Sequence, residues 1–115
     1  MLVVAVMIEQ LQKVIEVQQN FNTYIYFIGL LTKPYVKIGV SRNVAERLLE
    51  LQCGNPFQLV LLHMCPGNTA IEASLHHLLD KHRIRGEWFY HNQDVEKIIN
   101  HLKRSSVHMK LITDD

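Results

Sequence analysis

Four side chains that could act together on a phosphodiester lie in the first two thirds of the chain. The segment YIYFIGLLTKPYVKIG carries tyrosines and one lysine, Lys37. Arg47 and Glu72 follow on stretches with helical spacing. A phenol, an ammonium, a guanidinium and a carboxylate on one surface can activate water, hold a phosphate and bind one divalent cation. This combination suggests phosphodiester cleavage, provided that the fold brings the groups together.

A β-hairpin is predicted where the tyrosines and the lysine lie. Residues 24–30 and 35–40 are rich in β-branched and aromatic residues and are separated by a short turn. In the second strand, apolar positions alternate with Lys37 and Gly39, so one face is apolar and the other carries the functional groups. With a four-residue turn, Tyr26 faces Gly39 across the pair and shares a side with Lys37. A slip of one residue would separate them.

The remaining periodicities predict helices around a small sheet. Apolar residues recur at helical spacing in three segments, residues 42–52, 70–82 and 94–103. Ser41 is the expected N-cap of the first of these helices. The continuous apolar run over residues 57–65 predicts a central strand, and EWFY predicts a short aromatic one. The order predicts an α+β fold with a mainly antiparallel three-stranded sheet, formed by the hairpin and the central strand and flanked by helices.

The N-terminal run LVVAVMI predicts an accessory helix rather than a membrane span. It stops at Glu9, far short of the roughly 20 apolar residues that cross a bilayer. Apolar residues then recur at helical spacing, so we expect a helix over residues 5–20 that packs on the domain or on a second copy of the chain. The expected organisation is an accessory helix within residues 1–20, one domain over residues 21–104 and a flexible tail over residues 105–115.

The overall charge does not indicate nucleic-acid binding, which would require a local patch. The 115 residues carry 12 basic and 11 acidic side chains, for a net charge of +1. The densest basic cluster is formed by Lys81, His82, Arg83 and Arg85. Together with four further cations it could form a track for a nucleic-acid backbone, namely Lys33, Lys37, Arg42 and Arg47. The alternative is a scattered, solvated surface.

The cysteines and histidines do not predict a zinc site or a disulfide framework. Cys53 and Cys65 both follow apolar runs and are expected to be small, reduced core residues, which fits a soluble intracellular protein in cytoplasm or nucleus. His76 and His77 are adjacent and point about 100° apart on a helix. No second pair completes a tetrahedral set of ligands.

Together these motifs resemble the GIY-YIG nuclease superfamily, in particular its compact branch common in phages and other viruses. In that branch the second signature reads KIG. Here YIY, ending at Tyr26, stands in place of GIY, and KIG begins at Lys37. SRNVAER places Arg47 at the family's helix arginine, and EASLHHLLDKHRIRGEWF begins with Glu72 and contains the LH and GEWF features. The resemblance covers about residues 24–89.

The resemblance implies a metal-dependent endonuclease or DNA-processing domain. Glu72 would hold a single Mg²⁺ or Mn²⁺, with water and phosphate at the other coordination positions. Arg47 would bind a phosphate through its fork of donors. Tyr26 would deprotonate the attacking water, and the ammonium of Lys37 would favour the phenolate, since a free tyrosine has a pKa near 10. Three further residues are candidates for accessory roles: Tyr24, Tyr35 and His76.

Some features of the sequence depart from this pattern. Tyr24 replaces the glycine of the first signature, and Leu51 stands where some homing members carry a histidine. Glu72 follows Thr69 by three residues, so T-x-x-E could be a capping box that needs no metal. Trp88 and Phe89 are expected in the core rather than as base-stacking platforms.

Two alternative functions therefore stay open. One is a nucleic-acid-binding module that keeps the fold with little or no cleavage activity. The other is an interaction domain that dimerises through the N-terminal helix.

Overall fold

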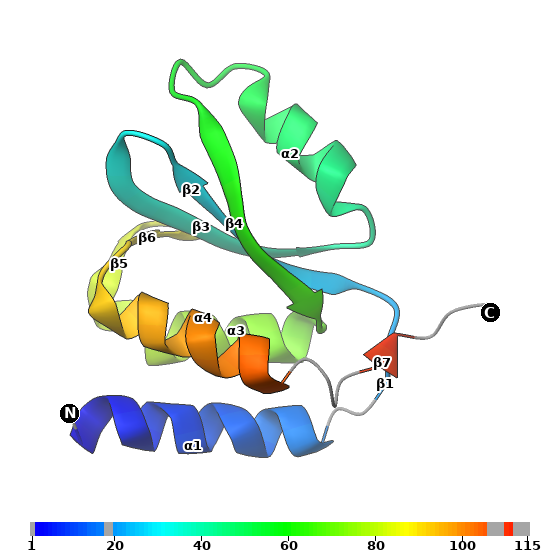
Figure 1. Cartoon of the computed structure of the whole chain (residues 1–115), viewed down its shortest axis with the longest axis vertical. Helices are drawn as coiled ribbons and strands as arrows, with labels where there is room; N and C mark the ends of the chain where they lie inside the picture. The colour runs from blue at the N-terminus through cyan, green and yellow to red at the C-terminus, as the bar shows by residue number, and fades with distance from the viewer. Residues whose placement is uncertain (1, 18–19, 106–109, 112–115) are drawn as a thin grey trace.

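A five-stranded antiparallel sheet forms the centre of a computed structural model of the chain (Figure 1). The structure describes residues 2–17, 20–105 and 110–111. Across the sheet the strands follow the order β4 (Leu59–Pro66), β2 (Tyr24–Leu30), β3 (Lys33–Ser41), β6 (Trp88–Tyr90) and β5 (Arg83–Arg85). Each neighbouring pair is antiparallel. The predicted α+β class is confirmed, with five strands in the sheet in place of three.

The strand predicted to be central, residues 57–65, is at the edge of the sheet. β4 pairs with β2 alone among the described strands, whereas β3 occupies the centre. The apolar run misled the prediction because β4 is covered on both faces by helices, α2 on one and α4 on the other. The added strand β5 is only three residues long, too short to show a period in the sequence.

Helices lie on both faces of the sheet (Figure 1). α2 (Val44–Gln52) covers one face, and α3 (Thr69–Leu78) and α4 (Gln93–Ser105) cover the other. α1 (Leu2–Val17) packs on α3 and α4 from outside, with Leu11 fully buried. Its bounds are shifted three residues towards the N-terminus from those predicted. A 3₁₀ turn, η1 (Asp80–His82), follows α3, so the predicted 70–82 helix ends earlier.

The alternation of side chains in the hairpin divides the core into two parts. Ile25 and Phe27 of β2 point towards α3 and α4, and Tyr26 and Ile28 point towards α2. The residues predicted to face inward from the last helix are all buried: Val95, Ile98, Ile99 and Leu102.

The two cysteines differ in exposure, and both are free thiols. Cys65 is buried as predicted, and burial raises the pKa of its thiol to about 12. The prediction was wrong for Cys53, which is exposed because it lies just past the end of α2.

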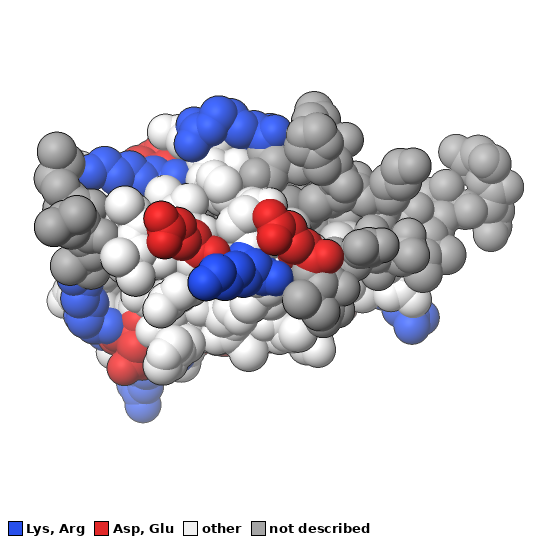
Figure 2. Space-filling model, turned by 90° about the horizontal axis from the view of Figure 1, so that it is seen from below, with Lys and Arg blue, Asp and Glu red and all other residues white. Residues whose placement is uncertain are grey.

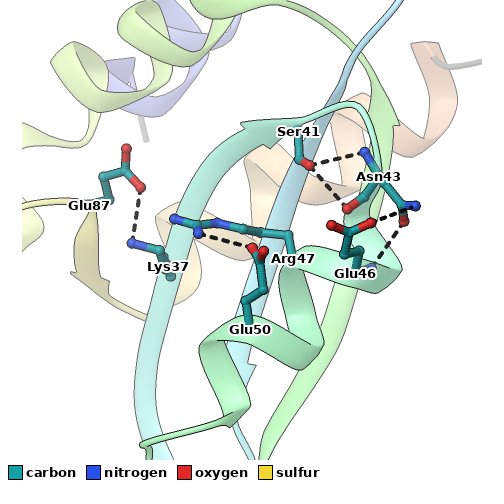
Figure 3. Close-up of polar contacts among 7 residues, drawn as sticks. All are labelled: Lys37, Ser41, Asn43, Glu46, Arg47, Glu50 and Glu87. Atoms are coloured by element: carbon teal, nitrogen blue, oxygen red, sulfur yellow. Dashed lines mark hydrogen bonds and ion pairs between the residues drawn. The ribbon is translucent and has the colours of Figure 1, made fainter.

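The helix caps also differ from prediction. The Oδ1 of Asn43 accepts a hydrogen bond from the backbone N–H of Glu46 at 3.0 Å and caps α2 (Figure 3). Ser41 is not the cap, since its Oγ instead accepts from the backbone N–H of Asn43.

The outer surface of α1 carries charges of both signs. Figure 2 shows this face from below, where the acidic and basic side chains of the described residues lie interspersed. No described helix has the length and apolar character required to cross a membrane. Beyond the sheet, β1 (Asn20–Phe21) pairs in parallel with β7 (Lys110–Leu111). The rest of the predicted tail, after residue 105, lies outside the described residues.

Candidate active site

The hairpin has the predicted register. Tyr26 pairs with Gly39, and Ile28 pairs with Lys37, so the phenol and the ammonium lie on the same face of the sheet. The turn is shorter than predicted, since Lys33 already belongs to β3. A bulge beside Gly29 absorbs the difference and keeps the pairing of the functional residues.

Gly39 leaves the space that the ring of Tyr26 fills. A Cβ built on Gly39 would lie 2.3 Å from the Oη of Tyr26 and 2.4 Å from its Cζ. Because any side chain here would collide with the ring, the glycine of the KIG motif is what allows the phenol to lie against β3. Tyr26 is only 1% exposed.

Arg47 connects α2 to this phenol. A side-chain interaction with the phenol of Tyr26 raises the pKa of Arg47. A second, long contact joins Arg47 Nη1 to Glu50 Oε1 at 3.4 Å. The guanidinium extends across β3 towards Lys37 and Glu87 (Figure 3). With 41% of its side chain exposed, Arg47 remains accessible to a ligand.

The environment of Tyr26 disfavours the predicted phenolate. Burial raises the pKa of this phenol, and the negative charges of Glu87 and Glu72 raise it further. The hydrogen bond and charge of Arg47 lower this pKa without outweighing burial. In the metal-free protein these surroundings therefore favour the protonated phenol.

Lys37 is paired with a carboxylate that sequence reasoning missed. Its Nζ lies 3.0 Å from Glu87 Oε1 and 5.8 Å from the centre of the Trp88 ring. Glu87 follows Gly86, whose φ of 57° allows the turn between β5 and β6. The backbone carbonyl of Glu87 accepts a hydrogen bond from the backbone N–H of Ile38. The GEWF motif contained this glutamate, but a turn residue between two three-residue strands has no periodic pattern that would reveal its direction.

Glu72, on α3, interacts electrostatically with Glu87 and Lys37. Burial, followed by the charge of Glu87, raises the pKa of Glu72, and the charges of His76 and Lys37 lower it. Thr69 and Glu72 do not form the alternative capping box. Asn68 caps α3 instead, because its Oδ1 accepts a hydrogen bond from the backbone N–H of Ile71 at 3.1 Å.

Helix α3 contacts β3 near the point where strand β6 ends. Among the described residues, β6 pairs with β3 only up to Lys37, so this edge of β3 is open beyond Ile38. There the Nε2–H of His76 donates to the carbonyl of Ile38 at 2.8 Å. Glu72 lies one helical turn before His76 on the same side of α3.

The four predicted residues influence one another electrostatically. Arg47 lowers the pKa of Tyr26 and the charge of Glu72 raises it, while the charge of Lys37 lowers the pKa of Glu72.

The accessory candidates have other surroundings. Tyr24 packs beside α2, Tyr35 contacts the ring of Tyr90, and the Nε2 of His76 is engaged with Ile38.

In the predicted basic cluster, Arg83 makes contacts within the protein, whereas Lys81 and Arg85 are exposed to solvent. Arg83 bonds Asp80 at 2.9 Å and the carbonyl of Gly86, and lies 4.9 Å from the ring centre of Phe89. Lys81 and Arg85 are exposed. Arg42, also exposed, lines a pocket of about 390 Å³ with residues that include Ser41, Asn68 and Thr69.

The arrangement of carboxylates fits a metal site that substrate would complete. Within the described residues, no three histidine, cysteine or acidic side chains are placed to hold an ion by themselves. Mg²⁺ commonly binds through one or two carboxylates, with water and substrate phosphate as the other ligands. Glu72 is suited to this role, because the repulsion from Glu87 that raises its pKa would be relieved by a cation.

Comparison with known proteins places the chain in a family. The family model for the T5orf172 domain matches residues 23–103, which include all four candidate residues. No curated protein and no solved structure matches the chain significantly. Because the matched region spans well over half of the 115 residues, the chain belongs to the T5orf172 domain family.

Proposed function

We propose that this chain is a metal-assisted nuclease of the GIY-YIG type that hydrolyses phosphodiester bonds in nucleic acid, most simply DNA. The observation that carries the proposal is that Tyr26 and Lys37 share one face of the hairpin, with Arg47 and Glu72 close enough for their charges to shift the pKa of Tyr26. Membership of the T5orf172 family supports a nuclease-like or DNA-binding module.

Arg47 is the residue that would bind the phosphate. Its contact with Glu50 is long and exposed, so it costs little to exchange for a phosphate oxygen. The planar fork of the guanidinium can contact two oxygens at once.

Tyr26 would act first as a hydrogen-bond donor. Its phenol interacts with Arg47, and when protonated it has an O–H to offer to the attacking water or to a phosphate oxygen. Lys37, held at 3.0 Å from Glu87, would place its ammonium beside the developing negative charge.

Glu72 would hold the divalent cation, with Glu87 as the second carboxylate nearby. When bound there, the cation would offset the two charges that raise the pKa of Tyr26 and would polarise the phosphate. Without the cation, Arg47, Tyr26 and Lys37 would still bind and orient the phosphate group.

A binding module with little cleavage activity is the second candidate. Two observations favour it: Tyr26 is almost fully buried, and the ammonium of Lys37 is already neutralised by Glu87. Both reduce the chemistry available without a conformational adjustment.

Nicking of a supercoiled plasmid in Mg²⁺ or Mn²⁺ distinguishes the candidates. We expect the parent to nick, Glu72→Gln to lose activity, and Glu9→Gln, an exposed carboxylate on α1, to behave as the parent. Salt-dependent DNA binding without nicking would favour the binding module. The absence of any DNA binding would favour the interaction domain instead.

A further inference from the structure

An open pocket lies on the same face of the sheet as Lys37. It has a volume of about 280 Å³ and is lined by Leu30, Tyr35, Asn55, Ile84, Arg85 and Trp88. Small-molecule pockets usually measure roughly 300–1,000 Å³, so this one suits a small ligand. Its walls are mainly aromatic and aliphatic, with one guanidinium and one amide as polar groups.

The pocket adjoins the candidate active site. Lys37 lies 5.8 Å from the ring centre of Trp88, which also forms part of the pocket wall. Tyr35 precedes Lys37 by two residues on the same face of β3, a distance of roughly 7 Å. A nucleotide whose base occupied the pocket would therefore bring a neighbouring phosphate towards Lys37 and Arg47.

Exposed apolar and aromatic side chains surround this end of the sheet. Ile84 is 41% exposed, Tyr90 51% and Phe57 43%. Cations lie among them, since Arg85 lines the pocket and Lys33 Nζ lies 5.7 Å from the ring centre of Phe57. Aromatic surfaces interspersed with cations characterise proteins that bind single-stranded nucleic acids.

Trp88 is less buried than the sequence suggested. Phe89 is fully buried, as expected of a core residue, but its neighbour Trp88 is partly exposed at the pocket. The two residues differ because successive side chains of β6 point to opposite faces of the sheet.

We propose that this pocket receives one unpaired nucleobase, packed against Tyr35 and Trp88 with the guanidinium of Arg85 beside it. The amide of Asn55 can hydrogen bond to the edge of the base. A base inside a duplex has both faces covered by its neighbours and cannot enter. The inference rests on the proposed function and specifies its substrate: single strands, or duplexes with an unpaired nucleotide next to the cleaved bond.

Intrinsic fluorescence can test this, because Trp88 is the single tryptophan of the chain. The Glu72→Gln protein would be titrated without divalent cations with an oligothymidine, with its complementary duplex, and with the same duplex carrying one unpaired thymidine. We expect the single strand and the unpaired thymidine to change the Trp88 emission strongly, and the perfect duplex to change it little. An abasic site at the unpaired position should abolish the change.

A charge-matched pair of variants separates stacking from simple electrostatics. Arg85→Ala should weaken single-strand binding roughly tenfold, measured by anisotropy of a labelled oligomer, because it removes both a charge and a stacking partner. Lys97→Ala, an exposed cation on α4, should cost no more than about twofold. Both positions are exposed, so folding should be unaffected, which circular dichroism would verify.

Three results would overturn the inference. They are equal emission changes with perfect duplex and single strand, equal losses for the two variants, and self-association through the apolar rim without any response to oligomers. If the parent protein nicks plasmid while these results hold, only the base pocket is refuted. If no nucleic acid binds or is cleaved, the proposed function fails as well.

Discussion

The hydroxyl of Tyr26 occupies the space where a side chain on Gly39 would begin. The two residues pair across β2 and β3, and a Cβ on Gly39 would lie 2.3 Å from the phenol oxygen. This relationship links the two signature motifs physically, since the glycine of one makes room for the tyrosine of the other.

Gly39→Ala should displace the phenol and destabilise the fold. Overpacking against a buried ring costs about 1–3 kcal/mol, which urea unfolding would measure. Gly29→Ala is a matched control in the same hairpin, because its Cβ would meet the flexible end of Leu62 at 2.9 Å rather than a ring. Equal losses for the two variants would show that the phenol moves freely and that Gly39 has no special role.

Tyr26→Phe should change the alkaline stability of the protein. Burial raises the pKa of Tyr26 above its ordinary value of 10.0, so the folded state holds the proton more tightly than the unfolded chain. The resulting stabilisation is fully present below about pH 10 and is lost as the pH rises through the folded value. Urea unfolding between about pH 8 and about pH 11 should show a shallower decline for the variant. Parallel curves would contradict the raised pKa.

Glu72→Gln should stabilise the metal-free protein at neutral pH. Burial and the charge of Glu87 raise the pKa of Glu72, so the stabilisation due to its bound proton is present below about pH 4.5 and is lost as the pH rises through the folded value. At pH 7 the ionised carboxylate is therefore unfavourable, and we expect the glutamine to gain less than about 1 kcal/mol, since Glu72 is partly exposed. A less stable variant in chemical unfolding at pH 7 would argue that Glu72 is a structural residue.

Glu87→Gln should lower the pKa of both Tyr26 and Glu72. The charge of Glu87 raises each of them, and its removal also leaves Lys37 without its 3.0 Å partner. Carbon-detected NMR titration of the Glu72 carboxyl would measure the shift, with Glu46→Gln on α2 as the control. An unchanged titration would place Glu87 outside the group.

Periodicity predicted those parts of the fold in which one face of an element is buried. The pairing of Tyr26 with Gly39 follows from alternation, and the inward face of α4 follows from helical spacing. The edge position of β4 did not, because burial by helices on both faces resembles burial between strands. Asn43 was passed over as a cap because Ser41, two residues earlier, is an equally suitable residue type.

Order and spacing in the sequence selected Tyr26 and Glu72 as candidates but could not predict their ionisation. The protonation of the phenol depends on burial and on Glu87, a turn residue with no periodic pattern. Spacing also suggested a capping box at Thr69, whereas Asn68 caps the helix.

The most direct test is single-turnover cleavage of a labelled oligonucleotide in Mg²⁺ by the parent, Arg47→Lys, Glu72→Gln and the double variant. Residues that act on one phosphate as a unit give non-additive losses. We expect each single substitution to slow cleavage roughly 10²-fold or more, and the double variant to be little slower than the worse single one. Parental rates in both single variants would contradict the account, because neither the guanidinium nor the carboxylate would then take part in the reaction.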